Sequence, residues 1–372
     1  MTINEWLEIS EMSGKGNAKV TLTALQNDGE INRSTQLVVK GRYGTKYVNI
    51  RQKQYLWVLL EEEGEISGIK SNTIQYSYDR ESWTSFPSNG SITAPADTYV
   101  YFRNTSEDFN RNINFNIPWV DKINRFLFTT KGCVGGDLSE MGSMKLNNFY
   151  GMFYGNNNLT DSSSLVLPWT ELAQSCYRDM FNGCTSLVNV PQLFATTLES
   201  YCYENMFKGC TSLVNAPELP STALGYRCYL GMFEGCTSLT TAPQLPSTTL
   251  KRWCYRSMFL GCTSLTTAPE LPSTTLAENC YEGMFANCTS LTTAPELLAT
   301  TLKKYSYFSM FYGCSNLNYI KMLATDISAS YCLTDWVANV APTGIFVKHT
   351  NAELSFGIDG IPEGWTIIDA TE

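Results

Sequence analysis

Apolar and polar positions follow two different patterns, one in the first third of the chain and one in the rest. Residues 1 to about 54 alternate apolar and polar side chains with a period of two, which is typical of half-buried β-strands. The expected strands are 6–10, 19–24, 35–40 and 46–52, with turns at Gly14, Gly16, Gly29, Gly41 and Gly44. Residues 55 to about 104 predict a second β unit that contains a structural hairpin across 73–86, turning at Asp79 and Arg80.

From about residue 150 the alternation gives way to a repeat. The pair Met-Phe recurs at intervals of 26 residues, and an earlier copy lies 28 residues upstream. The pairs begin at Met180, Met206, Met232, Met258, Met284 and Met310, and the earlier one at Met152. Each unit joins a segment CYxxMF, which we interpret as a short helical turn, to an extended segment LTTAPELP. One unit cannot bury its apolar side alone, so the pattern predicts stacked units around one continuous core.

Columns of equivalent residues define the expected core and one expected edge. The core columns are the Met-Phe pairs together with Leu187, Leu213, Leu239, Leu265, Leu291 and Leu317. A proline column consists of Pro191, Pro217, Pro243, Pro269 and Pro295. Because proline has no N–H to donate to a ladder, we expect a short strand or none at that edge, with polyproline-like backbone.

Twelve of the 13 cysteines fall on two further columns. One is Cys176, Cys202, Cys228, Cys254, Cys280 and Cys332; the other is Cys184, Cys210, Cys236, Cys262, Cys288 and Cys314. Buried free thiols packed as small hydrophobes are the favoured interpretation, because Ser306 fills one position and could complete neither a bridge nor a soft-metal site. Disulfides between units and a metal site are the alternatives, although there is no C-x₂-C spacing and only one histidine.

Composition and charge limit the classes of partner that the chain could bind. The net charge of −9 and the pI of about 4.9 argue against nucleic acid, because phosphate binding needs a basic surface. No segment approaches the roughly 18 apolar residues of a membrane span. Only 16% of residues are charged, while Thr, Ser, Asn and Tyr are plentiful, which suits a surface that meets sugars or proteins. The start MTINEWLEIS has no basic or apolar region of a secretory signal, which favours a protein that does not use that route.

Candidate chemistry is sparse. His349 is the single histidine, with no nucleophile motif near it, and we interpret it as a surface or packing residue. Phosphate-loop, H-E-x-x-H and EF-hand patterns are absent. The acidic column is interpreted as a solvated face, with a calcium site as the alternative; it reads Gln192, Glu218, Gln244, Glu270 and Glu296. We therefore predict no enzyme activity, no cofactor and no metal.

The most varied columns follow the TTL triplet, and they hold aromatic and arginine residues. Such side chains anchor interfaces and stack on sugar rings. The predicted binding stripe consists of Tyr201, Tyr226, Arg227, Arg252, Trp253 and Tyr305. The alternative is a variable, solvated edge whose side-chain stems cover the core.

Two parts of the chain resemble known families. The unit CYRSMFLGCTSLTTAPELPSTTL at 254–276, the lead-in 126–153 and the segments 332–348 and 360–369 resemble BspA-like leucine-rich repeat proteins of gut Bacteroidetes and their phages. The order WLxIS, SGKGN, NRSTQLVVK, YVNIRQKQ resembles the BACON domain, a small β-sandwich associated with carbohydrate or mucin binding.

The predicted fold is a mixed α/β solenoid, leucine-rich-repeat-like with 26-residue units, preceded by small all-β sandwich-like domains. Its expected parts are a BACON-like β-sandwich (1–54), a second small β domain (55–106), a lead-in and N-terminal cap (107–151), leucine-rich-like repeats (152–336) and a C-terminal cap (337–372).

The resemblance implies a non-catalytic structural or adhesion protein that binds glycan or protein at a surface. A phage virion component (fibre, decoration or tail-associated) is favoured by the signal-free start and the reduced-looking cysteines. The alternative is a bacterial cell-surface BspA-like adhesin whose signal peptide was removed. Expected partners are other virion or surface proteins and host or mucin glycans, with no nucleic acid and no membrane span; assembly into a homo-oligomer stays open.

Overall fold

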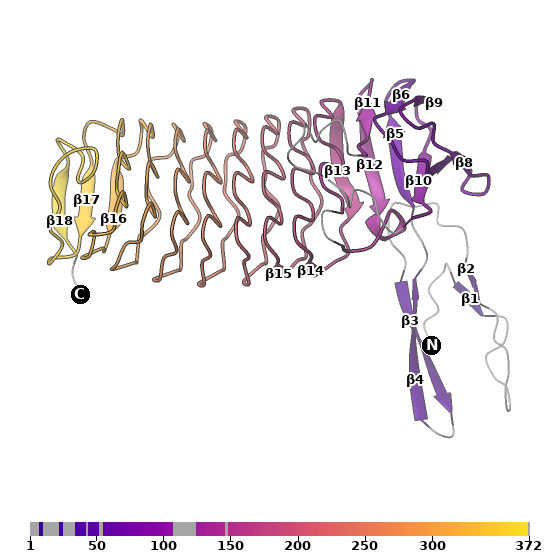
Figure 1. Ribbon diagram of the computed structural model, residues 1–372, viewed down its shortest axis with the longest axis horizontal. Helices are drawn as coiled ribbons and strands as arrows, with labels where there is room; N and C mark the ends of the chain where they lie inside the picture. Colours follow the sequence, from indigo (N-terminus) through magenta and orange to yellow (C-terminus); the bar gives the residue numbers. More distant parts are fainter. Residues whose placement is uncertain are drawn as a thin grey trace.

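The computed structural model describes residues 7–9, 22–24, 34–41, 44–51, 55–106, 124–145 and 148–370. The turns expected at Gly14, Gly16 and Gly29 and the first part of the expected lead-in, 107–123, lie outside these residues. Within them, the chain forms a row of stacked coils with β-strands at both ends (Figure 1).

The four strands expected in residues 1–54 are confirmed within the described part of that segment. They pair as two antiparallel hairpin-like sheets: β1 (Leu7–Ile9) with β2 (Leu22–Ala24), and β3 (Ser34–Gly41) with β4 (Gly44–Arg51). Gly41 and Gly44 close the β3–β4 pair, as the turn signals predicted.

The second β unit joins the solenoid through a shared sheet. That sheet has the order β13-β12-β5-β10-β7-β8, and a smaller one has the order β11-β6-β9. Their strands are β5 (Leu56–Leu60), β6 (Gly64–Ser67), β7 (Ile74–Ser77), β8 (Thr84–Ser85), β9 (Ser91–Ala94), β10 (Val100–Asn104), β11 (Leu127–Phe128), β12 (Gly132–Asp137) and β13 (Leu159–Val166). The approach of β5 to β12 is close: Gly136 has a φ of +100°, and a Cβ there would collide with the carbonyl oxygen of Tyr55.

The predicted hairpin is confirmed. β7 and β8 pair antiparallel around a turn in which Arg80 has a φ of 67°. The Asp79 carboxylate accepts the backbone N–H groups of Glu81 and Ser82 at 2.8 and 2.7 Å, and these hydrogen bonds hold its pKa well below the usual range.

The solenoid itself is a β-solenoid with almost no helix, so the expected mixed α/β fold is wrong. The only helix among the described residues is the 3₁₀ turn η2 (Leu138–Glu140). The coils are built from turns, with one short parallel pair, β14 (Glu171–Leu172) and β15 (Thr197–Leu198), and isolated parallel bridges such as Asn215 to Thr241 and Thr241 to Thr267. The short or absent strand expected on the proline-containing edge is therefore confirmed.

The segment CYxxMF is not helical because its backbone bonds to the next coil. In one coil Ser175, Tyr177 and Asp179 have φ values of 61°, 59° and 53°, and this alternation of left-handed residues cannot continue a right-handed helix. The N–H of Phe181 donates to the carbonyl of Met206 at 2.9 Å, and that of Phe207 to Met232 at the same distance. Every second N–H of the segment thus ties two coils together, while those in between, such as that of Met180, donate to a carbonyl three residues back in the same coil.

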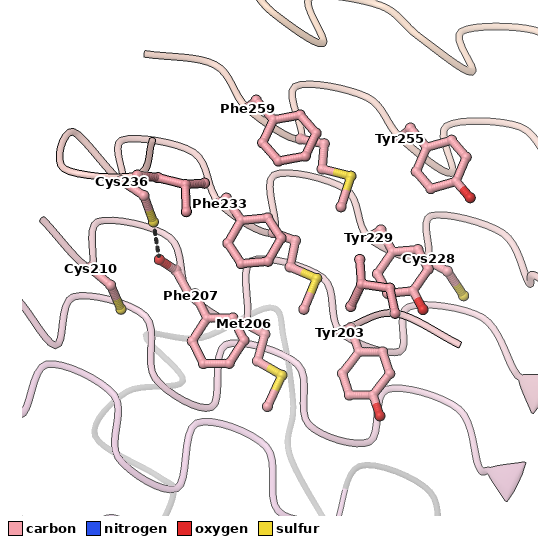
Figure 2. Close-up of a cluster of buried hydrophobic side chains, with 14 of the residues drawn as sticks. Tyr203, Met206, Phe207, Cys210, Cys228, Tyr229, Phe233, Cys236, Tyr255 and Phe259 are labelled. Carbon is pink, nitrogen blue, oxygen red and sulfur yellow. Dashed lines mark hydrogen bonds between the residues drawn. The ribbon is translucent and has the colours of Figure 1, made fainter. Parts of the chain in front are cut away.

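Two aromatic stacks run through the core (Figure 2). The phenylalanines of the Met-Phe pairs stack from Phe153 to Phe311 with centroids 5.3–5.7 Å apart and rings within 9° of parallel. A tyrosine column stacks from Tyr177 to Tyr307 at 5.7–6.2 Å. The leucine and methionine columns are buried beside them, as predicted.

The cysteine columns pack as predicted. All 13 cysteines are free thiols, and the twelve column members are buried. The Cys236 S–H donates to the carbonyl oxygen of Phe207 in the preceding coil at 3.0 Å (Figure 2), and the same bond recurs along its column. Burial raises the pKa of Cys262 to about 12, so these thiols stay protonated and act as packing groups.

The C-terminal end is a parallel three-stranded sheet of β16 (Tyr319–Met322), β17 (Ile345–Lys348) and β18 (Thr366–Asp369). Trp336 lies at the end of both aromatic stacks, 6.4 Å from the ring of Tyr307 and 6.1 Å from that of Phe311. Its indole N–H donates to the carbonyl of Gly360 at 2.9 Å, which closes the core.

Candidate functional site

Five of the six residues of the predicted binding stripe come together on three successive coils. Tyr226 lies between Tyr201 and Trp253, with both ring centroids 5.4 Å from its own. Arg227 and Arg252 place their guanidinium groups 5.3 and 4.7 Å from the centroid of Trp253. These residues form one band, which we call the aromatic–arginine band.

Tyr305 does not belong to this band. Asn279, the equivalent residue of the coil between Trp253 and Tyr305, is buried and donates its amide to Glu282. Tyr305 stacks instead on Tyr331, with centroids 4.9 Å apart and rings 9° from parallel.

The band is held at a position where the backbone is left-handed. Tyr201, Arg227 and Trp253 have φ values of 66°, 59° and 63°. Bulky residues rarely adopt this conformation, which costs about 1–2 kcal/mol per residue. The coil fixes it because the N–H of Tyr201 donates to the carbonyl of Tyr226 in the next coil at 2.8 Å.

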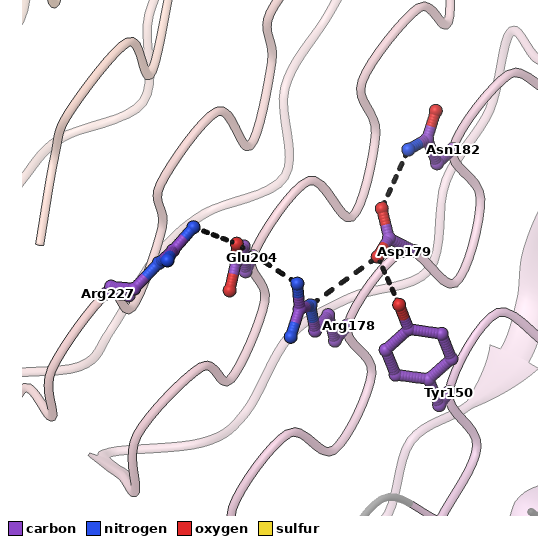
Figure 3. Close-up of polar contacts among 6 residues, drawn as sticks. All are labelled: Tyr150, Arg178, Asp179, Asn182, Glu204 and Arg227. Atoms are coloured by element: carbon purple, nitrogen blue, oxygen red, sulfur yellow. Dashed lines mark hydrogen bonds and ion pairs between the residues drawn. The ribbon is translucent and has the colours of Figure 1, made fainter. Parts of the chain in front are cut away.

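A buried ionic network is connected to the band through Arg227 (Figure 3). Glu204 accepts from Arg227 at 2.8 Å and lies 3.4 Å from Arg178. Arg178 also contacts Asp179, which accepts the hydroxyl of Tyr150 at 2.9 Å. Asp179 and Glu204 are 3% and 1% exposed, so their charges have lost their water and depend on these partners.

Burial has the largest effect on the pKa values of the acidic groups in this network. It raises the pKa of Glu204, against the lowering effect of the Arg178 and Arg227 charges. It likewise raises the pKa of Asp179, and both burial and the nearby Asp179 carboxylate raise the pKa of Tyr150. The arginines therefore serve two roles at once: they neutralise buried carboxylates and contact the rings of the band.

A second surface was not predicted from the sequence. A groove of about 630 Å³ lies across three successive coils on the side that carries the proline column. We call it the inter-coil groove; its lining is Ser163, Val188, Asn189, Val190, Pro191, Gln192, Leu193, Phe194, Asn215, Ala216, Pro217, Glu218 and Pro220. Val188 and Phe194 are each 47% exposed, an unusual state for large apolar side chains on one small surface.

A signal for this groove was present in the repeat. Thr240 and Pro246 occupy the positions of Val188 and Phe194 in a later coil, so the apolar residues depart from the common unit. The predicted binding stripe was taken only from the columns that follow the TTL triplet, so it did not include Val188 or Phe194.

The remaining predicted residues are solvent-exposed or structural. All five members of the acidic column are exposed, which confirms the solvated face, and Glu296 pairs with Lys321 at 3.0 Å. His349 accepts the backbone N–H of Asn351 through Nδ1 at 3.0 Å. In the described ranges, no group of three or more His, Cys, Asp or Glu residues is arranged to hold a metal. No helix among the described residues is long and apolar enough to cross a membrane.

Comparison with known proteins identifies one segment. Residues 2–53 match the BACON family, whose description is "Putative binding domain, N-terminal". The described strands β1 to β4 lie inside this match. No curated protein and no solved structure matches the chain.

Proposed function

We propose that this chain is a non-catalytic structural and adhesion protein that binds glycan or protein at a surface, and that it is a component of a phage virion. The match of residues 2–53 to a binding-domain family supports a binding role. The resemblance of the repeats to BspA-like proteins supports the adhesive, surface-exposed setting.

The observation that carries the proposal is the aromatic–arginine band. Its residues come from two neighbouring columns that vary between coils. In one of these columns, Ser175 and Asn279 show that the coil forms without aromatic or arginine residues there. A partly exposed, preorganised cluster of Tyr, Trp and Arg has the composition of interface hot spots. The side chain of Arg252 is 52% exposed, which leaves its guanidinium accessible to a partner.

Two measurements test the proposal. Mass spectrometry of purified virions should detect the chain, whereas recovery only from bacterial envelopes would favour the cell-surface adhesin instead.

The double variant Tyr226→Ala/Trp253→Ala should lower binding to the isolated partner or host surface at least about tenfold, because each ring supplies hot-spot contacts. Tyr312→Ala, which removes an exposed ring outside the band, is the matched control. Unchanged binding by a folded double variant would overturn the assignment of the band.

A further inference from the structure

The inter-coil groove has the size and mixture of surfaces of a small-ligand site. Its volume of about 630 Å³ lies within the ~300–1,000 Å³ of ligand pockets. The ring of Phe194 and the side chains of Val188 and Pro217 provide apolar contact, while Asn189, Gln192 and Asn215 provide hydrogen-bonding groups.

The repeat shows that the fold does not require these residues. At the equivalents of Val188 and Asn189, later coils carry threonine pairs, namely Thr240–Thr241, Thr266–Thr267 and Thr292–Thr293. These coils stack in the same way, with parallel bridges from Thr241 to Thr267. A groove between two later coils, lined by Pro269, Glu270 and Leu298 among others, has a smaller volume of about 370 Å³. The larger groove, with its exposed Val188 and Phe194, is therefore a property of the first coils that coil stacking does not explain.

One end of the groove is preorganised by a carboxylate. Asp161 accepts the backbone N–H and the hydroxyl of Ser163, both at 2.7 Å, and the side-chain amide of Asn189 at 2.7 Å. The backbone of Asn189 is fixed as well, because its carbonyl accepts the N–H of Ser162 at 2.9 Å. Two polar residues of the groove thus have their orientations set before a ligand arrives, which lowers the entropy cost of binding.

Charge indicates the class of ligand. Among the described residues that line the groove, Glu218 is the only charged one. A groove with one carboxylate and no cation, on a chain of net charge −9, disfavours sialylated, sulfated or uronic-acid sugars.

We propose that the inter-coil groove binds a neutral glycan. A pyranose ring has an apolar face for the half-exposed ring of Phe194 and hydroxyl groups for the Asn and Gln amides. The inference rests on the proposed binding role but places the sugar at a site separate from the aromatic–arginine band.

The test uses the full chain on a panel of immobilised neutral oligosaccharides, each beside its sialylated or sulfated form. Neutral members should bind and their acidic forms should bind more weakly. Phe194→Ala should lower the affinity for a bound neutral member at least about tenfold, and Phe194→Leu should do nearly the same, because leucine keeps apolar volume but offers no ring. Leu298→Ala, at the equivalent position beside the smaller groove, should leave the affinity unchanged.

A second variant separates loss of the site from loss of the fold. Val188→Thr/Asn189→Thr/Val214→Thr/Asn215→Thr gives the first coils the residues of the later ones, so it should melt like the native chain and still lose binding. Retention of native affinity by Phe194→Leu would indicate general apolar docking of a protein and overturn the proposal. Absence of any neutral ligand would overturn it too, while the virion and band measurements would still decide the proposed function independently.

Discussion

At the scale of single residues, buried polar groups affect the stability of each coil through the hydrogen bonds that they make or lack. Buried tyrosines place hydroxyl groups inside the solenoid, and these hydroxyl groups differ in whether they have a hydrogen-bond partner. Tyr150 donates to the Asp179 carboxylate, whereas the hydroxyl of Tyr255 is buried with no hydrogen-bond partner in the described part of the chain. A buried polar group without a partner costs about 1–3 kcal/mol.

This contrast predicts opposite effects of the same substitution. Tyr255→Phe removes an unpartnered hydroxyl and keeps the ring in its stack, so the free energy of unfolding should rise by about 1 kcal/mol. Tyr150→Phe is the matched control: it removes a buried hydrogen bond to a charged group and should lower the free energy of unfolding by about 1.5–3 kcal/mol. Chemical denaturation of both variants measures the two signs. Destabilisation by Tyr255→Phe would mean that its hydroxyl has a partner, such as an internal water.

At the scale of the element, the 26-residue coil is the unit of both sequence and structure. The period, the buried Leu, Met and Phe columns and the packed thiols could all be predicted, because repeated burial imposes repeated residue types. The helical turn could not be judged correctly, because the left-handed conformation of Tyr201, Arg227 and Trp253 is set by bonds to neighbouring coils rather than by local preference. The gathering of five band residues followed from column alignment. The separation of Tyr305 from the band could not be predicted in this way, because it depends on Asn279, which is buried in the coil between Trp253 and Tyr305.

If the coil is the unit, then removing one whole coil should leave a folded chain. Deletion of 241–266 joins Thr240 to Thr267, which is the equivalent of Thr241, so every column stays in register. Phe233 would then stack on Phe285. The variant should unfold cooperatively at a lower temperature, because it loses one set of coil contacts. Deletion of the half coil 241–253 is the control, and it should abolish cooperative unfolding in a thermal melt. Equal melting of the two deletions would contradict a register set by the coil.

Charge pairs between coils reinforce this register. Arg178 and Glu204 occupy equivalent positions in successive coils, and Arg256 and Glu282 repeat the arrangement with an ion pair of 2.9 Å. Nearly identical coils could otherwise stack out of order, since their apolar columns match in any order. Opposite charges on neighbours favour the native order, which is the use of ionic groups best supported by other repetitive folds.

At the scale of the whole molecule, the stability of a stack of coils depends on how its two terminal coils are covered. Each coil contacts only its neighbours, so the terminal coils have one unpaired face unless another element covers it. The N-terminal end is covered by the β5–β12 sheet, in which Gly136 permits close approach, and the C-terminal end by Trp336 and the β16–β18 sheet. The sequence suggested a separate small β unit at 55–106; the shared sheet could not be foreseen, because strand pairing between distant segments leaves no local pattern.

This arrangement predicts that a destabilising substitution at one end causes local unfolding that is greatest at that end. Trp336→Ala removes the ring that covers Tyr307 and Phe311, and it leaves the carbonyl of Gly360 without its indole donor. The loss should be about 3–5 kcal/mol, as for other buried tryptophans. Because coils couple only to neighbours, amide hydrogen exchange should accelerate most in 300–336, while the amides of β12 and β13 keep their native protection. Tyr331→Ala, which removes an exposed ring from the same coil, should change exchange little. Uniform acceleration of amide exchange along the solenoid would show instead that the coils unfold as a single cooperative unit, whose stability does not depend particularly on its ends.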